Sequence, residues 1–265
     1  MKTKLVVVGA GGRMGKRIIA LAVESGEFDI AGAVEIQGHP DIGKDAGLNA
    51  GAGSVDVKLA DMFGDGGEVV IDFSLPEAAD KTVDYCLKNK VALVSGTTGL
   101  SIKQREKFDA ASKEIPIIYG TNMSVGMNVM FNVVGKVATK LGEEYDIEIV
   151  EQHHRFKKDA PSGSALTLAE NICKETGRDV DKTLVHGREG ESLRQKGTVG
   201  MHSVRAGDII GVHSVIFGTL GETVTLNHTA NSRDTFVRGA LKAAKWLVGK
   251  EPGLYSMADV LGIEY

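Results

Sequence analysis

The sequence has 265 residues, a formal charge of −4 and 42% hydrophobic residues. This length fits one large domain or two modest ones, and the apolar content suffices for a buried core, which excludes a globally disordered chain. The apolar runs are far shorter than the roughly 20 residues that cross a bilayer, and the small negative charge gives nothing to favour nucleic acid as a partner. The N-terminus lacks the apolar region of a secretion signal, so we expect a cytoplasmic protein in which Cys86 and Cys173 are free thiols.

Strands and helices alternate over the first 120 residues. Apolar, β-branched runs predict strands at residues 5–8, 29–34, 68–73, 91–95 and 115–119. Amphipathic segments between them predict helices, one opened by a capping box of Ser74 and Glu77 and another by Ser101 and Gln104. This alternation predicts an α/β fold with a Rossmann-like, doubly wound parallel sheet.

The pattern changes after residue 122. A long helix over 125–141 precedes a strand at 145–153 and a helix at 162–175, and strands at 198–204, 208–217 and 222–229 then follow one another without helices. Consecutive strands of this kind predict an α+β domain with an open mixed or antiparallel sheet. The last helix, 234–248, is expected to pack on the first sheet. We therefore predict a dinucleotide-binding domain from 1–124 plus about 234–265, and a substrate-binding and oligomerisation domain from about 125–233.

The first strand leads directly into a glycine-rich loop, Gly9-Ala10-Gly11-Gly12-Arg13-Met14-Gly15. Glycine permits a tight turn and close backbone approach, and the helix that follows offers free N–H groups to a pyrophosphate, although an ordinary tight turn would have the same glycines. Glu35 ends the second strand, where a carboxylate binds the adenosine ribose and repels a 2′-phosphate, and Ile36 supplies no compensating cation. These residues favour NADH, while the nearby cations keep NADPH open; they are Arg13, Lys16, Arg17 and Lys44.

Small polar loops also follow three later strands. They are Phe73-Ser74, Gly96-Thr97-Thr98 and Thr121-Asn122-Met123. Because the carboxyl ends of parallel strands meet at one edge, these loops are expected to converge with the glycine loop and to suit a nicotinamide and its ribose. Each loop taken alone is more often an ordinary turn, so the prediction depends on their convergence.

The densest polar cluster of the chain is the segment 151–165. It contains His153, His154 and Lys157, which can exchange protons near neutral pH, and the segment Ser162-Gly163-Ser164, which opens a helix whose N-terminus suits a carboxylate. A metal site formed by Glu151, His153, His154 and Asp159 is disfavoured, because adjacent strand residues point to opposite faces and do not chelate one ion. We predict no metal, and a solvated loop without chemistry is the remaining alternative.

This segment, with the glycine loop, resembles the 4-hydroxy-tetrahydrodipicolinate reductase (dihydrodipicolinate reductase) family, and the resemblance covers essentially the whole chain. The pattern His-His-x-x-Lys-x-Asp-Ala-Pro-Ser-Gly-Ser, from His153 to Ser164, is its most specific part. The resemblance implies an NAD(P)H-dependent oxidoreductase that converts a cyclic dicarboxylate, 4-hydroxy-tetrahydrodipicolinate, to tetrahydrodipicolinate with loss of water, in diaminopimelate and lysine biosynthesis. It also implies a homotetramer.

The resemblance assigns roles to individual residues. His153 would be the acid/base residue and Lys157 the proton donor. The implied substrate-binding residues are His154, Ser162, Gly163 and Ser164. The implied cofactor-binding residues are Gly9, Ala10, Gly11, Gly12, Arg13, Met14, Glu35, Gly96, Thr97, Thr98, Gly120, Thr121, Asn122 and Met123.

Some positions depart from the family pattern. Phe156 stands where some members carry a further histidine, and Ser164 stands where threonine is common, which keeps the hydroxyl. His202, His213, His228 and Arg233 are interpreted as structural or interfacial. Two other functions stay open on the sequence: an amino-acid dehydrogenase of similar two-domain build, and a non-catalytic NAD-binding sensor.

Overall fold

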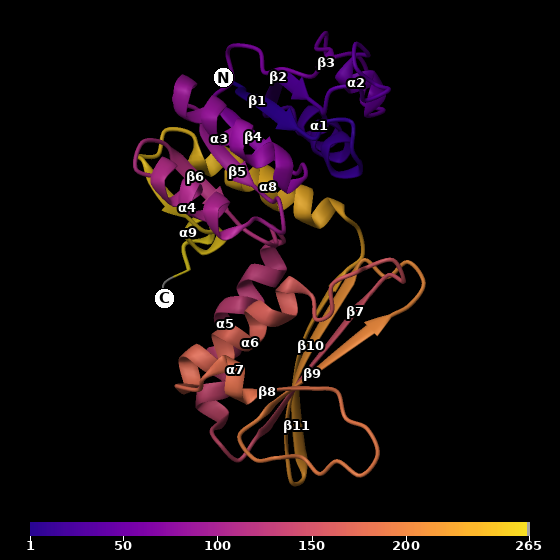
Figure 1. The fold of residues 1–265 in the computed structure, drawn as a ribbon, viewed down its shortest axis with the longest axis vertical. Coiled ribbons are helices and arrows are strands. Elements are labelled where there is room, and N and C mark those ends of the chain that lie inside the picture. Colours follow the sequence, from indigo (N-terminus) through magenta and orange to yellow (C-terminus); the bar gives the residue numbers. More distant parts are fainter. Residues whose placement is uncertain (264–265) are drawn as a thin grey trace. The chain divides into compact units, whose positions relative to one another are not determined.

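The computed structural model describes residues 1–263, which divide into two compact units (Figure 1). One unit contains residues 1–125 and the described residues from 234 onward, and the other contains residues 126–233. The domain predicted to reach residue 265 ends in two positions, 264 and 265, that lie outside the described residues. The chain thus leaves the first unit once and returns to it.

The first unit is built on a parallel sheet with the strand order β12-β6-β5-β4-β1-β2-β3 among the described residues. The order reverses direction at β1 and β4, as in a doubly wound fold. The predicted α/β class is therefore confirmed. The strands are β1 (Thr3–Val8), β2 (Phe28–Val34), β3 (Leu59–Ala60), β4 (Val69–Asp72), β5 (Ala92–Ser95), β6 (Pro116–Tyr119) and β12 (Gly253–Tyr255).

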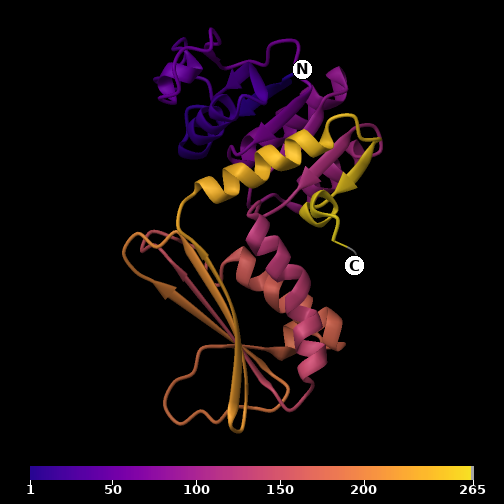
Figure 2. The same ribbon diagram turned by 180° about the vertical axis from the view of Figure 1, so that it is seen from behind.

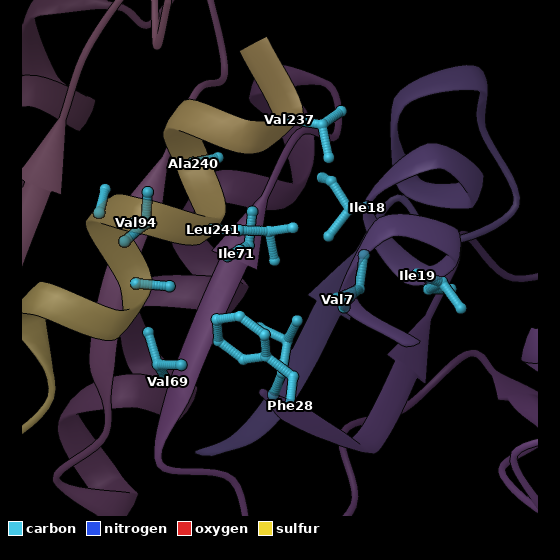
Figure 3. Close-up of a cluster of buried hydrophobic side chains, with 14 of the residues drawn as sticks. Val7, Ile18, Ile19, Phe28, Val69, Ile71, Val94, Val237, Ala240 and Leu241 are labelled. Carbon is cyan, nitrogen blue, oxygen red and sulfur yellow. The ribbon is translucent and has the colours of Figure 1, made fainter. Parts of the chain in front are cut away.

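Helices cover both faces of this sheet. They are α1 (Arg13–Ser25), α2 (Ala46–Asn49), α3 (Pro76–Asn89), α4 (Ile102–Ala111), α8 (Asp234–Leu247) and α9 (Met257–Leu261). Ile18 of α1 and Leu241 of α8 belong to the same buried cluster as Val7 and Ile71 of the sheet (Figure 3), and α8 is drawn in yellow in Figure 2. Side chains of α3 and α4 pack on the opposite face. Both faces of the sheet are thus buried, as parallel sheets require.

Local capping explains where two of these helices begin. The capping box predicted for Ser101 and Gln104 is confirmed at the start of α4. The one predicted for Ser74 is wrong, because α3 begins at Pro76 with Leu75 as its N-cap. The Ser74 hydroxyl instead donates to Asp72.

The second unit has a mixed sheet with the order β11-β10-β7-β9-β8. Strands β7, β10 and β11 pair antiparallel, whereas β9 pairs parallel with both β7 and β8, which confirms the predicted open mixed sheet. The strands are β7 (Asp146–His153), β8 (Leu184–His186), β9 (Val199–Arg205), β10 (Gly211–Thr219) and β11 (Glu222–Ala230), and the helices are α5 (Val125–Leu141), α6 (Gly163–Thr176) and α7 (Val180–Thr183).

Helices α5 and α6 lie side by side against one face of this second sheet (Figures 1 and 2). Met127 and Leu168 of these helices pack against Ile149, Val215 and Phe217, which alternate with half-exposed residues along their strands. No helix among the described residues of the unit packs on the other face of the sheet.

Two further observations concern the whole described chain. Cys86 and Cys173 are buried free thiols, as predicted, and burial raises the pKa of both. No helix within residues 1–263 is long and apolar enough to cross a bilayer.

Candidate active site

The loops predicted to bind a cofactor emerge from one edge of the first sheet. The Gly9 N–H donates to the Val34 carbonyl over 2.9 Å, so the glycine loop is tied to the end of β2. In the same way the Gly96 N–H donates to the Asp72 backbone carbonyl over 2.9 Å, and the Gly120 N–H donates to the Ser95 backbone carbonyl over 3.1 Å. Each loop is thus fixed to the end of a neighbouring strand, and this edge of the sheet is termed the rim.

The glycine loop is shaped by close backbone contacts. Gly9 has a φ of 76°, in the left-handed region that favours glycine. A Cβ on Gly15 would lie 2.1 Å from the Gly9 carbonyl oxygen, so α1 can approach the loop only with glycine at that position. The N-cap of α1 is Gly12, which has no side chain to satisfy the first N–H groups of the helix. This arrangement suits an anionic group at the helix N-terminus.

Glu35 closes the loop from the end of β2. One of its carboxylate oxygens accepts the Gly11 N–H over 2.8 Å and the other accepts the Ile36 N–H over 2.9 Å. A Cβ on Gly11 would approach the Glu35 carboxylate to 3.1 Å. The acidic residue is therefore held beside the glycine loop, where the dinucleotide-binding pattern places it.

Asp72, which the sequence analysis did not single out, organises two of the loops. Its fully buried carboxylate accepts the Ser74 N–H over 2.8 Å, the Ser74 hydroxyl over 2.5 Å and the Thr97 hydroxyl over 3.2 Å, all at Oδ1. The Thr97 side chain is consequently buried and turned inward, away from any ligand at the rim.

The remaining predicted cofactor-binding residues differ in burial, and among them Arg13 is exposed while Met14 and Asn122 are half-buried. Ala10 and Met123 are buried, and the Met123 side chain belongs to the core of the first unit. Thr98 and Thr121 are exposed at the rim. The structure thus brings the predicted residues to one edge, and their contacts with a cofactor stay a prediction.

In the second unit, His153 and Glu151 form a buried pair at the end of β7. They lie two residues apart on a strand, so both side chains point to the same face of the sheet. The His153 Nδ1 is 2.5 Å from Glu151 Oε2, and the Glu151 side chain is fully buried. A carboxylate hydrogen-bonded to one nitrogen of a histidine is a common arrangement for a proton-transferring imidazole.

Arg205 clamps the same carboxylate from the end of the parallel neighbour β9. Its two terminal nitrogens donate to the two Glu151 oxygens over 2.8 and 2.7 Å. Burial by itself would raise the pKa of Glu151, but hydrogen bonds from His153, Arg205 and Ser203 lower it far below its ordinary value. Glu151 is therefore a carboxylate near neutral pH.

His213, on the antiparallel neighbour β10, lies against the ring of His153. The ring centroids are 5.2 Å apart, edge to face. His213 Nε2 is 3.1 Å from the Ser162 hydroxyl, which also accepts the Ala165 N–H at the start of α6 over 3.2 Å. Burial and the neighbouring His153 lower the pKa of His213 to about 4, so its imidazole is neutral near pH 7. Ser162 is thus the N-cap of α6, and its predicted contact with a substrate stays a prediction.

The other residues singled out in this segment differ in burial and in their partners. Lys157 is partly buried, and its ammonium nitrogen lies 2.9 Å from an Asp159 carboxylate oxygen. His154 follows the end of β7 and is half-buried, Gly163 is exposed at the start of α6, and Phe156 is exposed to solvent at 79%. Within residues 1–263, His, Cys, Asp and Glu side chains nowhere gather in threes that could hold a metal ion.

The sequence analysis did not predict the roles of three residues in this network, Glu151, Arg205 and His213. Glu151 was weighed only as a metal ligand, although its spacing from His153 signals a shared strand face. The roles of Arg205 and His213 depend on which strands flank β7, and their separation along the chain gave no signal of that pairing.

Comparison with known proteins identifies the family. A family model described as "Dihydrodipicolinate reductase, N-terminus" matches residues 3–123, and one described as "Dihydrodipicolinate reductase, C-terminus" matches residues 126–261. The chain belongs to the dihydrodipicolinate reductase family. The resemblance drawn from the segment 153–164 and the glycine loop is confirmed.

Relatives of this family match the chain over its whole length. A protein of Geotalea daltonii named 4-hydroxy-tetrahydrodipicolinate reductase is 45% identical, with 98% of this chain and 99% of the relative covered. A protein of the same name from Geobacter sulfurreducens is also 45% identical and covers 99% of this chain and 100% of its own.

Solved structures share the family fold. A dihydrodipicolinate reductase from Paenisporosarcina sp. TG-14, described as dipicolinate-bound, has a TM-score of 0.71 at 24% identity and covers 98% of this chain and 99% of its own. GenD2 from gentamicin A biosynthesis, described as a complex with NAD, has a TM-score of 0.60 at 12% identity and covers 99% of this chain and 91% of its own. At these identities the likeness concerns the fold.

Proposed function

We propose that this chain reduces 4-hydroxy-tetrahydrodipicolinate to tetrahydrodipicolinate with a reduced nicotinamide dinucleotide, in diaminopimelate and lysine biosynthesis. A hydride and a proton are added to the substrate, and one water leaves. The observation that carries the proposal is the buried His153–Glu151 pair, in a segment that also contains Lys157, within a chain that matches the family over both units.

The proton chemistry is assigned to His153 and Lys157. Because His153 Nδ1 is bonded to Glu151, Nε2 is the nitrogen left to exchange a proton with the substrate. The Lys157 side chain is held by its ion pair with Asp159. Its ammonium group supplies the proton that accompanies the hydride. Both roles follow from the chemistry of the side chains near neutral pH.

The substrate carboxylates are assigned to the start of α6. Its backbone N–H groups and helix dipole favour an anion, and His154, Gly163 and Ser164 flank them. Ser162 contributes by capping the helix and so by fixing its first turn. Dipicolinate, a planar dicarboxylate, is the analogue that we expect to occupy this position.

The cofactor is assigned to the rim of the first unit, whose residues fit a dinucleotide. Gly9, Gly12 and Gly15 leave room for a pyrophosphate beside the start of α1, and Glu35 accepts hydrogen bonds from the ribose hydroxyls. When bound, the nicotinamide supplies the hydride. The loops at residues 96–98 and 120–123 would flank its ring.

NADH is the favoured cofactor. Glu35 repels a 2′-phosphate, and three of the four nearby cations, Lys16, Lys44 and Arg17, are paired with carboxylates. Lys16 and Lys44 both pair with Asp41, at 3.2 and 2.6 Å, and lower its pKa to about 2. Arg17 pairs with Asp234 at 2.6 Å. We therefore expect NADPH to be used less efficiently than NADH.

The proposed assembly is a homotetramer formed through the second unit. One face of its sheet is covered by α5 and α6, while the other carries half-exposed apolar side chains such as Val150 and Ile216. A symmetric oligomer would bury them. We place the enzyme in the cytoplasm, where reduced nicotinamide dinucleotides and amino-acid precursors are available.

The proposal is tested by following the absorbance of NADH, and separately NADPH, while the substrate is generated in place from pyruvate and aspartate semialdehyde by the preceding synthase. We expect oxidation that depends on substrate and is faster with NADH. Absence of oxidation with both cofactors, despite measured NADH binding, would contradict the reductase function.

The amino-acid dehydrogenase and the non-catalytic sensor are not favoured. The curated relatives that match at about 45% identity over the full chain are named as the reductase. A sensor would have no use for His153 and Lys157. Ammonia-dependent formation of NADH from an amino acid would be the result that reopens the dehydrogenase.

A further inference from the structure

The carboxylate of Glu151 has all of its acceptor positions occupied. Oε1 accepts hydrogen bonds from Arg205 and from the Ser162 N–H, at 2.7 and 3.2 Å. Oε2 accepts from Arg205 over 2.8 Å and faces His153 Nδ1 at 2.5 Å. A protonated carboxyl group would direct an O–H at one of these donors, so the site requires the ionised form.

This arrangement selects one tautomer of His153. A carboxylate only accepts hydrogen bonds, so the nitrogen that faces it, Nδ1, must carry a hydrogen. The neutral ring then has its lone pair at Nε2. The His213 ring packs edge to face on the same imidazole and limits its rotation.

Arg205 also holds the loop that carries Lys157. One terminal nitrogen of Arg205 donates to the Asp159 backbone carbonyl over 2.6 Å, in addition to its bond to Glu151. The Asp159 carboxylate in turn pairs with the Lys157 ammonium at 2.9 Å. One guanidinium group therefore connects the support of His153 with the support of Lys157.

We propose that Glu151 and Arg205 are positioning residues for the reduction, a role that rests on the proposed function. Glu151 holds His153 in the Nδ1–H tautomer, and Arg205 fixes both Glu151 and the loop of Lys157. Neither residue needs to touch the substrate. Supporting residues of this kind act by orienting the groups that do.

Replacing Glu151 by glutamine should reverse the tautomer with little change in shape. A carboxamide has one oxygen, and at the Oε1 position that oxygen keeps the bonds from one terminal nitrogen of Arg205 and from the Ser162 N–H, while the bond from the other terminal nitrogen to the Oε2 position is lost. The opposite orientation would direct the NH2 group at both of those donors. The NH2 group therefore faces His153 Nδ1, which must become the acceptor, and the ring hydrogen moves to Nε2.

Glu148 offers a matched control on the same strand. Its carboxylate is also held by two arginines and a histidine, since Arg188, Arg194 and His202 bind it at 2.6 to 3.0 Å. It lies three residues before Glu151 and so faces the other side of the sheet. Glu148→Gln removes an equivalent ion pair without touching His153.

The first experiment records ¹⁵N spectra of histidine-labelled protein by magic-angle spinning, raising the pH until the ring signals stop changing. His153 is assigned by its loss in His153→Asn. We expect Nδ1 protonated and Nε2 bare in the unaltered protein and in Glu148→Gln, and the reverse in Glu151→Gln. A His153 tautomer that is the same in all three proteins would overturn the proposal, whatever reaction the enzyme catalyses.

The second experiment measures turnover and NADH binding. Glu151→Gln should lower kcat by about 10²-fold or more, by analogy with the loss that follows a wrong histidine tautomer in serine proteases. Arg205→Lys keeps the positive charge but loses the bidentate hydrogen bonds to Glu151, and it should lower kcat by about 10-fold or more. Both should leave the Kd for NADH unchanged, and Glu148→Gln should keep kcat.

The two experiments separate the possible failures. Turnover lost equally in Glu148→Gln and Glu151→Gln would mean that the sheet needs both ion pairs for its structure, and would contradict a positioning role. An unaltered enzyme without activity on this substrate would contradict the proposed function alone, because the ¹⁵N spectra would still decide the tautomer.

Discussion

The buried imidazole of His213 makes folding depend on pH in the mildly acidic range. Burial and the nearby His153 lower its pKa to about 4 in the folded protein, whereas an unfolded histidine titrates near pH 6.5. Between these pH values His213 is protonated in the unfolded chain but neutral in the folded chain. Its contribution to the free energy of unfolding therefore decreases as the pH falls from about 6.5 toward 4.

We predict that His213→Gln flattens this part of the pH profile. The free energy of unfolding, measured with urea from about pH 7 to pH 4, should decline less steeply in the variant than in the unaltered protein. The variant loses the Ser162 contact and is therefore expected to be less stable at neutral pH, so the comparison concerns the slope. Parallel slopes would mean that His213 titrates normally in the folded state.

Glu148 makes a second contribution at lower pH. Arg188, His202 and Arg194 lower its pKa from 4.5 to about 2 although burial by itself would raise it. A depressed carboxyl pKa stabilises the fold above the unfolded value, and this stabilisation is lost as the pH falls from about 4.5 toward 2.

Glu148→Gln should therefore destabilise the protein most at neutral pH, on the order of 1–3 kcal/mol. The difference from the unaltered protein should shrink as the pH falls below about 4.5, because the unfolded chain then takes up a proton at Glu148 that the native carboxylate, with its pKa of about 2, does not. Unfolding by urea over that range measures this difference. A gap that stays constant with pH would show that the ion pairs are not its source.

At the scale of the element, the start of α1 depends on one glycine. A Cβ on Gly15 would lie 2.1 Å from the Gly9 carbonyl oxygen and 2.6 Å from the Ala10 Cα, and both are backbone atoms that cannot turn aside. The loop and the helix must then separate. This separation would disturb the N–H groups that the proposed pyrophosphate site requires.

We predict that Gly15→Ala weakens NADH binding by about 10-fold or more and destabilises the protein by roughly 1–3 kcal/mol. Gly26→Ala is the matched control at the other end of α1, where a Cβ would meet nothing within 4 Å. Because Gly26 has a positive φ, this substitution should lower stability without affecting NADH binding. Calorimetric titration with NADH measures the binding. Equal affinities in the two variants would contradict a cofactor site at this loop.

The helix boundaries show how far local sequence decides structure. Ser101 and Gln104 form the capping box expected of them, because the partners lie within one turn. Ser74 has the same local pattern but is recruited by Asp72, a buried carboxylate whose need for hydrogen-bond donors exceeds that of the helix end. A propensity is thus overridden where a buried charge competes for the same hydroxyl group.

At the scale of the whole molecule, the uncovered face of the second sheet is the proposed subunit interface. Ile216 alternates along β10 with the buried Val215 and Phe217 and points to that face. Light scattering should give four times the chain mass of 28.1 kDa for the unaltered protein.

Ile216→Lys should dissociate the assembly, because a charge would be buried without a partner at the interface. Ile102→Lys is the control, since Ile102 is 69% exposed on α4 of the first unit. Its mass should stay that of the unaltered protein. An unchanged mass for Ile216→Lys would exclude this face as the contact between subunits.

The sequence by itself determined the order of the longer elements, the class of both sheets and the family, but it did not predict the short strands β8 and β12. Hydrophobic periodicity distinguishes helices from strands locally, and the run from His153 to Ser164 is specific enough to indicate the chemistry. It also predicted that loops 9–14, 96–98 and 120–123 share an edge, because that follows from any parallel sheet.

The tertiary structure decided which distant residues support the candidate site. Arg205 meets Glu151 because β9 pairs parallel with β7, and His213 meets His153 because β10 pairs antiparallel on its other side. No local pattern fixes these pairings, since they depend on how the whole sheet buries its apolar face against α5 and α6. The acid/base residue was therefore visible in the sequence, whereas the groups that set its tautomer became visible only in the fold.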